Sequence, residues 1–254
     1  MPTIALLSDI HANIHALRAV LAEVDSLGID NRVFCGDIVG YGARSAECVR
    51  LVRESGGVAV MGNHDYYAVR ARQHPESFPS QEKSRDNPVL AGIHHALKVL
   101  DDDALDWLAA LPLELEIPGA LVAHAALHDF KDWPYLHDSM AALPTLEILD
   151  RSKFEIGFFG HTHRQEWFSL PDKPSLVRLD EGKFHLQPGS VCAVIVGSVG
   201  QPRTGDNRAA WTIWDSDART FEFRQTDYPF ELSAEEIIDA GLPISSASRL
   251  MGRF

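Results

Sequence analysis

The sequence predicts a layered α/β fold. Its first half contains short apolar segments that end in turn residues, and a segment with helical periodicity follows each of them. Continuous apolar strands that alternate with helices are typical of sheets covered by helices on both faces. The chain has 254 residues, of which 45% are hydrophobic, so it can bury a sizeable core. We expect residues 1–254 to form a single compact domain, with two domains as the alternative.

Strands and helices alternate regularly in the first half. The segment "TIALLSD" predicts a buried strand, and Asn13 is placed to cap the helix that follows. "RVFCGD" predicts a second strand, which precedes a helix from about Ser45. "VAVMGN" predicts a third strand, which precedes a short helix from about His64. This order indicates βαβ units.

The middle of the chain breaks this alternation. Residues 72–88 contain three prolines and show no periodicity, and loops of this length are usually either functional or disordered. Asn87 and Pro88 then open a helix, and a further helix is expected around Ala104 to Ala110. Residues 72–110 are therefore a candidate helical cap or lid.

The second half is rich in predicted strands. They are "LELEI", "ALVAH", "EIGFFG", "QEWFSL", "FHLQPGS", "CAVIVGSV" and a hairpin in "AAWTIWDSDARTFEFRQ". "SAEE" at Ser233–Glu236 has the pattern of a capping box and predicts the start of a last helix. The apolar "VCAVIVGSV" fits either a core strand or a subunit edge, which leaves a homo-oligomer open.

Composition excludes several classes of partner. The formal net charge of −13 disfavours a surface that holds a nucleic-acid polymer, which needs clustered Lys and Arg. A small phosphorylated substrate stays compatible with this charge, because bound cations can reverse the local potential. No apolar run approaches the roughly 20 residues of a membrane span, and Asp9 interrupts the first apolar stretch too early for a signal peptide. Three cysteines give no disulfide framework. We expect a cytoplasmic protein with no membrane partner.

Polar side chains with metal-binding chemistry follow the predicted strands. Asp9 and His11 are two positions apart, a spacing that places both on one side of a strand. The carboxyl ends of strands in an open, mostly parallel sheet share one edge, so the whole set is expected to converge there. Its members are Asp9, His11, Asp37, Asn63, His64, His124, His161 and His163.

This set has the composition of a shell for two metal ions. Carboxylate, amide and imidazole groups suit first-row divalent ions such as Mn, Fe, Co, Ni or Zn. The absence of cysteine from this set disfavours a structural zinc site. One carboxylate can bridge two ions roughly 3.5 to 4 Å apart. Gly36, Gly62 and Gly160 stand beside the ligand candidates and allow abrupt turns from strand to loop.

Five motifs in this set together resemble the calcineurin-like metallophosphoesterases. They are D-x-H at 9–11, GD at 36–37, GNHD at 62–65, a lone His124 after an apolar strand and GHTH at 160–163. "GYG" after Asp37 and "GSVGQPR" at 197–203 are similar to the small prokaryotic phosphodiesterase branch. The resemblance implies a two-sheet β-sandwich flanked by helices, with a dimetal site at the carboxyl ends of the strands.

The resemblance also implies a role for each matching residue. The ligands would be Asp9, His11 and His163 for one ion, Asn63, His124 and His161 for the other, and Asp37 as the bridge. A hydroxide held between the ions would attack phosphorus in line with the leaving oxygen. His64 would act at the leaving group as proton donor or charge stabiliser, and Asp65 would orient its ring.

The implied activity is metal-dependent hydrolysis of a phosphodiester in a small or nucleotide-like substrate, with Mn or Fe as the favoured metals. A phosphomonoesterase of the same fold is the nearest alternative, and a non-catalytic scaffold is a second one. Tyr41 is a candidate for stacking on a base or leaving group, or else an anchor of its loop. Arg203 is a candidate contact to substrate phosphate, with an ion pair to Asp206 as the alternative.

Overall fold

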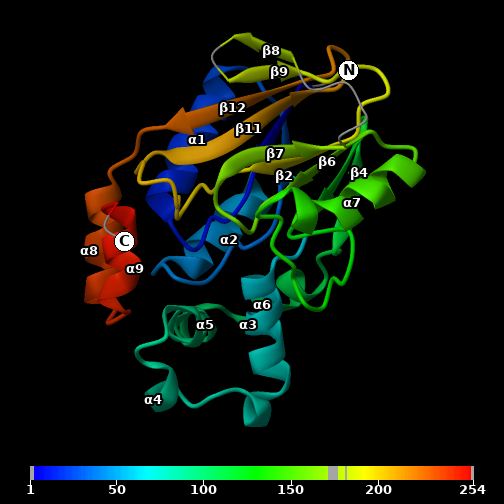
Figure 1. The fold of residues 1–254 in the computed structure, drawn as a ribbon. Coiled ribbons are helices and arrows are strands. Elements are labelled where there is room, and N and C mark those ends of the chain that lie inside the picture. Colours follow the sequence, from blue (N-terminus) through cyan, green and yellow to red (C-terminus); the bar gives the residue numbers. More distant parts are fainter. Residues whose placement is uncertain (1–2, 171–176, 181, 253–254) are drawn as a thin grey trace.

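The structure is a computed structural model that describes residues 3–170, 177–180 and 182–252. Within these ranges, two mixed β-sheets pack face to face and helices cover their outer faces (Figure 1). The strand order is β3-β2-β1-β11-β12-β9-β8 in one sheet and β4-β5-β6-β10-β7 in the other. The expected β-sandwich flanked by helices is therefore confirmed.

The three N-terminal strands are parallel neighbours. β1 (Thr3–Leu7) pairs with β2 (Asn31–Phe34), and β2 pairs with β3 (Val58–Ala59). The connections contain α1 (Ile14–Ser26) and α2 (Ser45–Glu54), as predicted. The carboxyl ends of these strands lie at one edge of the sheet, and the candidate ligands follow there.

The other half of this sheet is antiparallel. β11 (Ala209–Asp215) pairs with β1, and β12 (Thr220–Thr226) pairs with β11 to form the hairpin predicted at this position. β9 (Lys183–His185) and β8 (Val177–Asp180) complete the sheet.

The second sheet contains β4 (Glu114–Ile117), β5 (Ala120–Ala123), β6 (Ile156–Phe159), β10 (Cys192–Val196) and β7 (Gln165–Ser169). β5, β6 and β10 are parallel, and β4 and β7 add antiparallel edges. β10 lies between β6 and β7 and is buried along its whole length. The segment "VCAVIVGSV" is therefore a core strand rather than a subunit edge.

A layer of helices lies beyond the ends of the strands (Figure 1). It contains α3 (Asn63–Gln73), a 3₁₀ turn (Pro75–Ser77), α4 (Gln81–Ser84), α5 (Pro88–Val99) and α6 (Asp102–Ala109). α3 packs against α5 and α6. The proline-rich segment thus contains two short helical turns, and its action as a cap or lid stays a prediction.

The C-terminal helices differ from the prediction. α8 (Phe230–Asp239) begins at Phe230, so the predicted capping box "SAEE" lies inside the helix and is wrong as its start. Pro229, whose φ is fixed by its ring, precedes the first turn instead. The Ser233 hydroxyl makes a tertiary contact, a hydrogen bond donated to Asn13 Oδ1 over 2.8 Å. α9 (Ile244–Leu250), which was not predicted, packs against α8.

Alternation along the strands divides the core into layers. Leu6 packs between the two sheets, whereas Leu7 packs in the helical layer that contains α1. Phe158 likewise points between the sheets, whereas Phe159 faces α7 (Ser139–Arg151). α7 was not predicted, because Pro144 in its interior breaks the usual helix pattern. Among the described residues, no helix is long and apolar enough to cross a membrane.

Asn13 joins three segments of the chain at the start of α1. Its Oδ1 atom accepts the Ala16 N–H, which caps α1, and also accepts the Ser233 hydroxyl from α8. Its Nδ2 atom donates to the Gly200 carbonyl over 3.0 Å and to the Tyr228 hydroxyl over 3.1 Å. The side chain is buried, so its loss would leave these groups without their partner.

We expect Asn13→Ala to lower the free energy of unfolding by roughly 2 to 4 kcal/mol, because it removes a cap and leaves buried polar groups unpaired. Asn87→Ala is the matched control. Asn87 caps α5 through the N–H groups of Val89 and Leu90 at an exposed position, and its loss should cost about 1 kcal/mol. Urea unfolding followed by circular dichroism measures both. Equal losses would contradict the tertiary role of Asn13.

Candidate metal centre

Five of the candidate ligands adopt a left-handed backbone conformation. Their φ angles are 51° at Asp9, 47° at His11, 56° at Asp37, 68° at His161 and 63° at His163. Such a conformation costs a non-glycine residue roughly 1 to 3 kcal/mol and is concentrated at functional sites. β1 ends before Asp9, so these turns, and not the strand itself, bring the Asp9 and His11 side chains together. The strained turns at one edge indicate a functional site.

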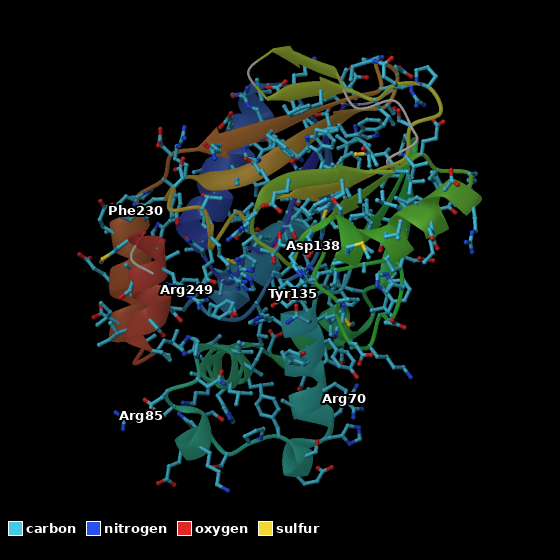
Figure 2. All side chains as sticks on the ribbon, viewed as in Figure 1. Arg70, Arg85, Tyr135, Asp138, Phe230 and Arg249 are labelled. Atoms are coloured by element: carbon cyan, nitrogen blue, oxygen red, sulfur yellow. The ribbon has the colours of Figure 1, made fainter. Side chains whose placement is uncertain are left out.

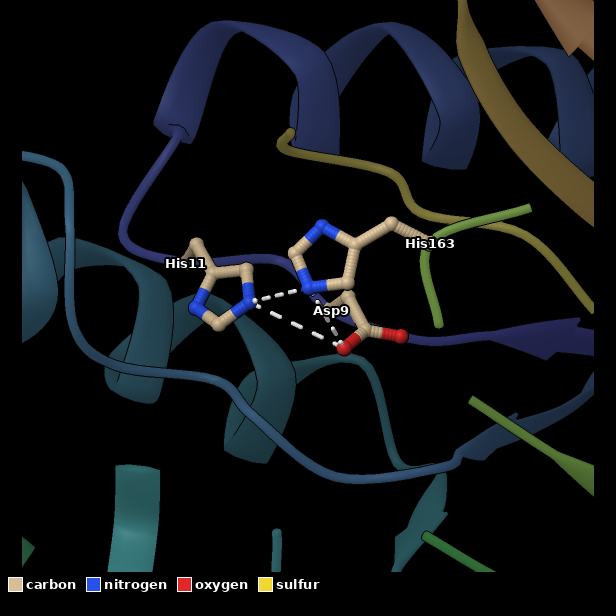
Figure 3. Close-up of side chains that lie close together, drawn as sticks. All are labelled: Asp9, His11 and His163. Atoms are coloured by element: carbon tan, nitrogen blue, oxygen red, sulfur yellow. Dashed lines mark hydrogen bonds and ion pairs between the residues drawn. The ribbon is translucent and has the colours of Figure 1, made fainter. Parts of the chain in front are cut away.

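Asp9, His11 and His163 form the first group of ligand atoms (Figure 3). The Nε2 atoms of the two imidazoles are 3.1 Å apart, and Asp9 Oδ1 lies 3.2 Å from His163 Nε2 and 3.7 Å from His11 Nε2. All three side chains are buried. A buried carboxylate and two ring nitrogens that converge in this way need a proton or a cation between them.

Asp37, Asn63, His124 and His161 form the second group. His124 Nε2 lies 3.1 Å from Asn63 Oδ1 and 3.3 Å from Asp37 Oδ2. The ligand atoms of Asp37, His124 and His161 all lie within 4.8 Å of one another. Asp37 Oδ2 is also 3.7 Å from His11 Nε2 in the first group. The seven predicted ligands therefore come together in two adjacent groups, with Asp37 facing both.

Backbone carbonyls fix the orientation of the imidazoles. The pairs are His11 Nδ1 with Val39 O at 3.2 Å, His124 Nδ1 with Cys35 O at 2.7 Å, and His163 Nδ1 with Gln201 O at 2.6 Å. A ring that donates its Nδ1–H to a carbonyl keeps the Nε2 lone pair free for a cation. His161 is turned the other way, with Nε2 3.0 Å from Trp133 O, so its Nδ1 is the free ligand atom.

Burial and mutual contact set the charges in the site. Burial lowers the pKa of His161 to about 4 and that of His163 well below its ordinary value. Burial opposes ionisation of Asp37, but the His124 and His64 imidazoles hold its pKa well below its usual range. Asp37 in turn raises the pKa of His124 to about 9, against the effect of burial. Neutral His161 and His163 rings beside the ionised Asp37 carboxylate are donors that suit cations.

The donor set fits first-row divalent ions. In the described part of the chain, the clustered candidate ligands are Asp and His side chains, and the Asn63 amide adds an oxygen beside His124. Imidazole and carboxylate donors without thiolate suit ions such as Mn, Fe, Co, Ni and Zn. The residues present therefore fit the metals that their sequence motifs imply.

Two glycines leave the space that these ligands occupy. A Cβ atom on Gly36 would lie 2.7 Å from Gly62 N and 2.8 Å from His124 Nδ1. A Cβ atom on Gly62 would overlap the Asp37 carboxylate. Gly36 also has a φ of 88°, which favours glycine.

His64 lies beside the ligands, and Asp65 does not orient it. The His64 ring centroid is 4.7 Å from that of His11, and its Nδ1 atom is buried and has no hydrogen-bond partner among the described residues. The Asp65 carboxylate accepts backbone N–H groups instead, those of Asp37, Ile38, Val39 and Gly62 at 2.9 to 3.2 Å. The expected contact from Asp65 to the His64 ring is therefore wrong, and Asp65 holds the loop that carries Asp37.

Tyr41 and Arg203 lie at the mouth of the site. The Tyr41 ring centroid is 4.7 Å from that of His11 and 4.6 Å from that of His64. The backbone N–H of Arg203 donates a hydrogen bond to the backbone carbonyl of His163. Asp206 pairs with Arg208, so the alternative ion pair between Asp206 and Arg203 is not formed.

The loop after β5 contributes residues that were not predicted. Trp133, with a φ of 49°, presents its carbonyl to His161, and the Tyr135 ring stacks on the His161 ring with centroids 3.9 Å apart. Two aromatic residues in a loop after a ligand histidine are the signal that could have indicated them. His128 lies outside the site and contacts Thr145 Oγ1 at 3.1 Å.

Comparisons with known proteins identify the family of this chain. The family model described as calcineurin-like phosphoesterase matches residues 2–165, a range that contains all seven candidate ligands. A solved structure of a metallophosphoesterase from Sphaerobacter thermophilus superimposes with a TM-score of 0.80 at 30% sequence identity, covering 99% of this chain and 98% of the other.

Two curated relatives differ in how much of their length is matched. An uncharacterised protein of Methanocaldococcus jannaschii, MJ0912, is 34% identical over 256 residues, which cover 98% of each chain. A symmetrical bis(5'-nucleosyl)-tetraphosphatase of Colwellia psychrerythraea is 26% identical over 173 residues, covering 66% of this chain and 58% of the relative. The family match, the full-length relative and the converging ligands together show that this chain belongs to the calcineurin-like phosphoesterase family.

Proposed function

We propose that this protein is a dimetal phosphodiesterase that acts on a small or nucleotide-like phosphoester. The observation that carries the proposal is the Asp37 carboxylate, which faces two adjacent groups of ligand atoms at once. The residues that would hold the ions are Asp9, His11 and His163 for one, Asn63, His124 and His161 for the other, and Asp37 for both.

The protein positions the reacting groups and supplies a proton donor. Bound divalent ions supply Lewis acidity, which lowers the pKa of water and offsets charge on the phosphate. The carbonyl contacts of His11, His124 and His163 fix their rings before substrate arrives, which avoids reorganisation during the reaction. Hydrolysis forms a P–O bond to the attacking hydroxide and breaks the bond to the leaving oxygen, which departs as an alkoxide or phenoxide and needs a proton or a stabilising hydrogen bond.

His64 is suited to act on this leaving group. Burial lowers its pKa to about 3, so the ring is neutral near pH 7 and carries one N–H. The ring contacts Tyr41 on one side and His11 on another, which places it directly beside the ligand cluster. An N–H donor there can stabilise developing charge on the leaving oxygen.

A diester is favoured over a monoester by the surroundings of the site. Tyr41 and Tyr135 both contact ligand histidines with their rings, which gives aromatic surfaces for an organic group on the phosphate. The tetraphosphatase relatives are named for a substrate with a nucleoside at each end. A phosphomonoesterase of the same fold is the rival activity, and a scaffold without turnover is the alternative from another class.

Two further parts of the proposal concern conditions in the cell. We favour Mn or Fe as the native metals, among the first-row ions that a site of nitrogen and oxygen donors without thiolate accommodates. We favour the cytoplasm as the location, since Cys35, Cys48 and Cys192 are all free thiols.

Hydrolysis of bis(p-nitrophenyl) phosphate tests the proposal. We expect metal-stripped protein to be inactive, Mn²⁺ to restore turnover, and Asp37→Asn to lose at least about 10²-fold in kcat, because a neutral amide cannot bridge two cations. His137→Gln is the control, since this ring is 67% exposed and lies outside the ligand cluster. Full activity and full Mn²⁺ content in Asp37→Asn would contradict the proposal.

The role of His64 is tested by the leaving group. We expect His64→Asn to lower kcat by about 10²- to 10⁴-fold, with Mn²⁺ content measured by mass spectrometry unchanged. The loss should be greater for phenyl esters than for p-nitrophenyl esters, because the poorer leaving group depends more on a proton donor. His128→Asn, outside the site, is the matched control. An equal loss for both esters would identify His64 as a charge stabiliser, and lost metal would make it a ligand.

A further inference from the structure

An open pocket of about 640 Å³ adjoins the candidate metal centre, and three arginines line it. Arg164 follows the GHTH motif, Arg203 belongs to the segment "GSVGQPR", and Arg249 lies on α9. Tyr41 and Tyr135 form the wall next to the metal centre. Figure 2 shows Arg249 on the C-terminal helices, facing the region of Tyr135. We call this feature the arginine pocket.

The two tyrosines connect the arginine pocket to both groups of ligands. The Tyr41 ring contacts His11 of the first group with centroids 4.7 Å apart, and the Tyr135 ring stacks on His161 of the second group at 3.9 Å. The backbone N–H of Arg203 donates a hydrogen bond to the backbone carbonyl of the candidate ligand His163. A molecule held at the metal centre therefore has the arginine pocket as its immediate neighbour.

The carboxylates of the described residues leave the arginines in this pocket poorly neutralised. Arg203 and Arg249 make no ion pair with a carboxylate among the described residues, and the buried Arg203 Nε has no hydrogen-bond partner there. Arg164 has only a long contact of 3.8 Å to Glu166. This is unusual in a chain with a net charge of −13, where arginines such as Arg44 and Arg219 pair with glutamates at 2.7 and 2.5 Å.

Guanidinium groups that line one pocket and have few carboxylate partners among the described residues fit an anion with several oxygens. Arginine binds phosphate through paired N–H donors, and such charge-assisted hydrogen bonds are stronger than neutral ones. The rest of the chain carries a net negative charge, which repels a long polyanion. A compact anion that extends from the metal centre into the arginine pocket contacts the guanidinium groups and avoids the negative charge elsewhere on the chain.

We propose that the arginine pocket binds a second phosphate group of the substrate, covalently linked to the phosphate at the metal centre. The preferred substrates then carry at least two phosphates, and α9 contributes to specificity through Arg249. This inference rests on the proposed function, because it places the reacting phosphate at the metal ions.

Calorimetric titration of Mn²⁺-loaded protein with methylphosphonate and methylenediphosphonate, at a fixed free Mn²⁺ concentration, tests the inference. The two probes carry one and two phosphonates and are not hydrolysed. We expect the diphosphonate to bind more tightly to the wild-type protein, and Arg249→Ala to reduce that advantage about tenfold, as expected for a lost charge-assisted hydrogen bond. Arg249→Lys should restore part of it. Arg85→Ala, an exposed arginine outside the arginine pocket, should leave the advantage unchanged.

Two outcomes would overturn the inference. If Arg249→Ala and the wild-type protein prefer the diphosphonate over the methylphosphonate by the same factor, the second phosphonate lies on the metal ions alone. Binding of two methylphosphonates per chain would make the pocket an independent site for free anions. Failure of the proposed function is distinguishable, because the absence of any turnover of bis(p-nitrophenyl) phosphate would contradict the phosphodiesterase while leaving this binding measurement intact.

Discussion

The contacts of the Asp37 carboxylate are the constraint on which the rest of the site depends. Oδ2 faces His124 and His11, which belong to different ligand groups, and Oδ1 accepts the backbone N–H of His64 at 2.7 Å. The Asp65 carboxylate fixes the backbone of Asp37 by accepting its N–H. The buried Asp37 carboxylate thus sets the distance between the two ligand groups. It also holds the start of α3, which carries His64.

This arrangement is costly for the fold and explains several of its local features. Asp9, His11 and Asp37 sit in left-handed turns, which a stable fold without function would avoid. Parallel strands bring the turns to one edge, and Gly36 and Gly62 leave no side chain where the ligands must lie. The layered core supplies the stability that offsets the strain, since central strands such as β1 and β10 are buried on both faces.

The sequence was sufficient to predict features that depend on local pattern and failed where tertiary contacts decide. Apolar runs predicted most of the strands, although not β8 (Val177–Asp180), and the polar residues after them predicted the converging ligands. "SAEE" failed as a helix start because α8 already begins at Phe230, and the Ser233 hydroxyl bonds to Asn13 instead of capping the helix. Asp65 was assigned to the His64 ring, but its oxygens face backbone N–H groups. Arg249 lines the adjoining pocket through the packing of α9, which no spacing in the chain encodes, whereas Tyr135 stacks on His161 from a loop whose aromatic residues were the missed signal.

Electron paramagnetic resonance of Mn²⁺-loaded protein tests the central claim, a pair of ions bridged by Asp37, most directly. We expect two equivalents of Mn²⁺ per chain to give the spectrum of an exchange-coupled pair, and Asp37→Asn to abolish the coupling. The spectrum of isolated ions in the wild-type protein at full loading, or coupling that is unchanged in Asp37→Asn, would contradict the account.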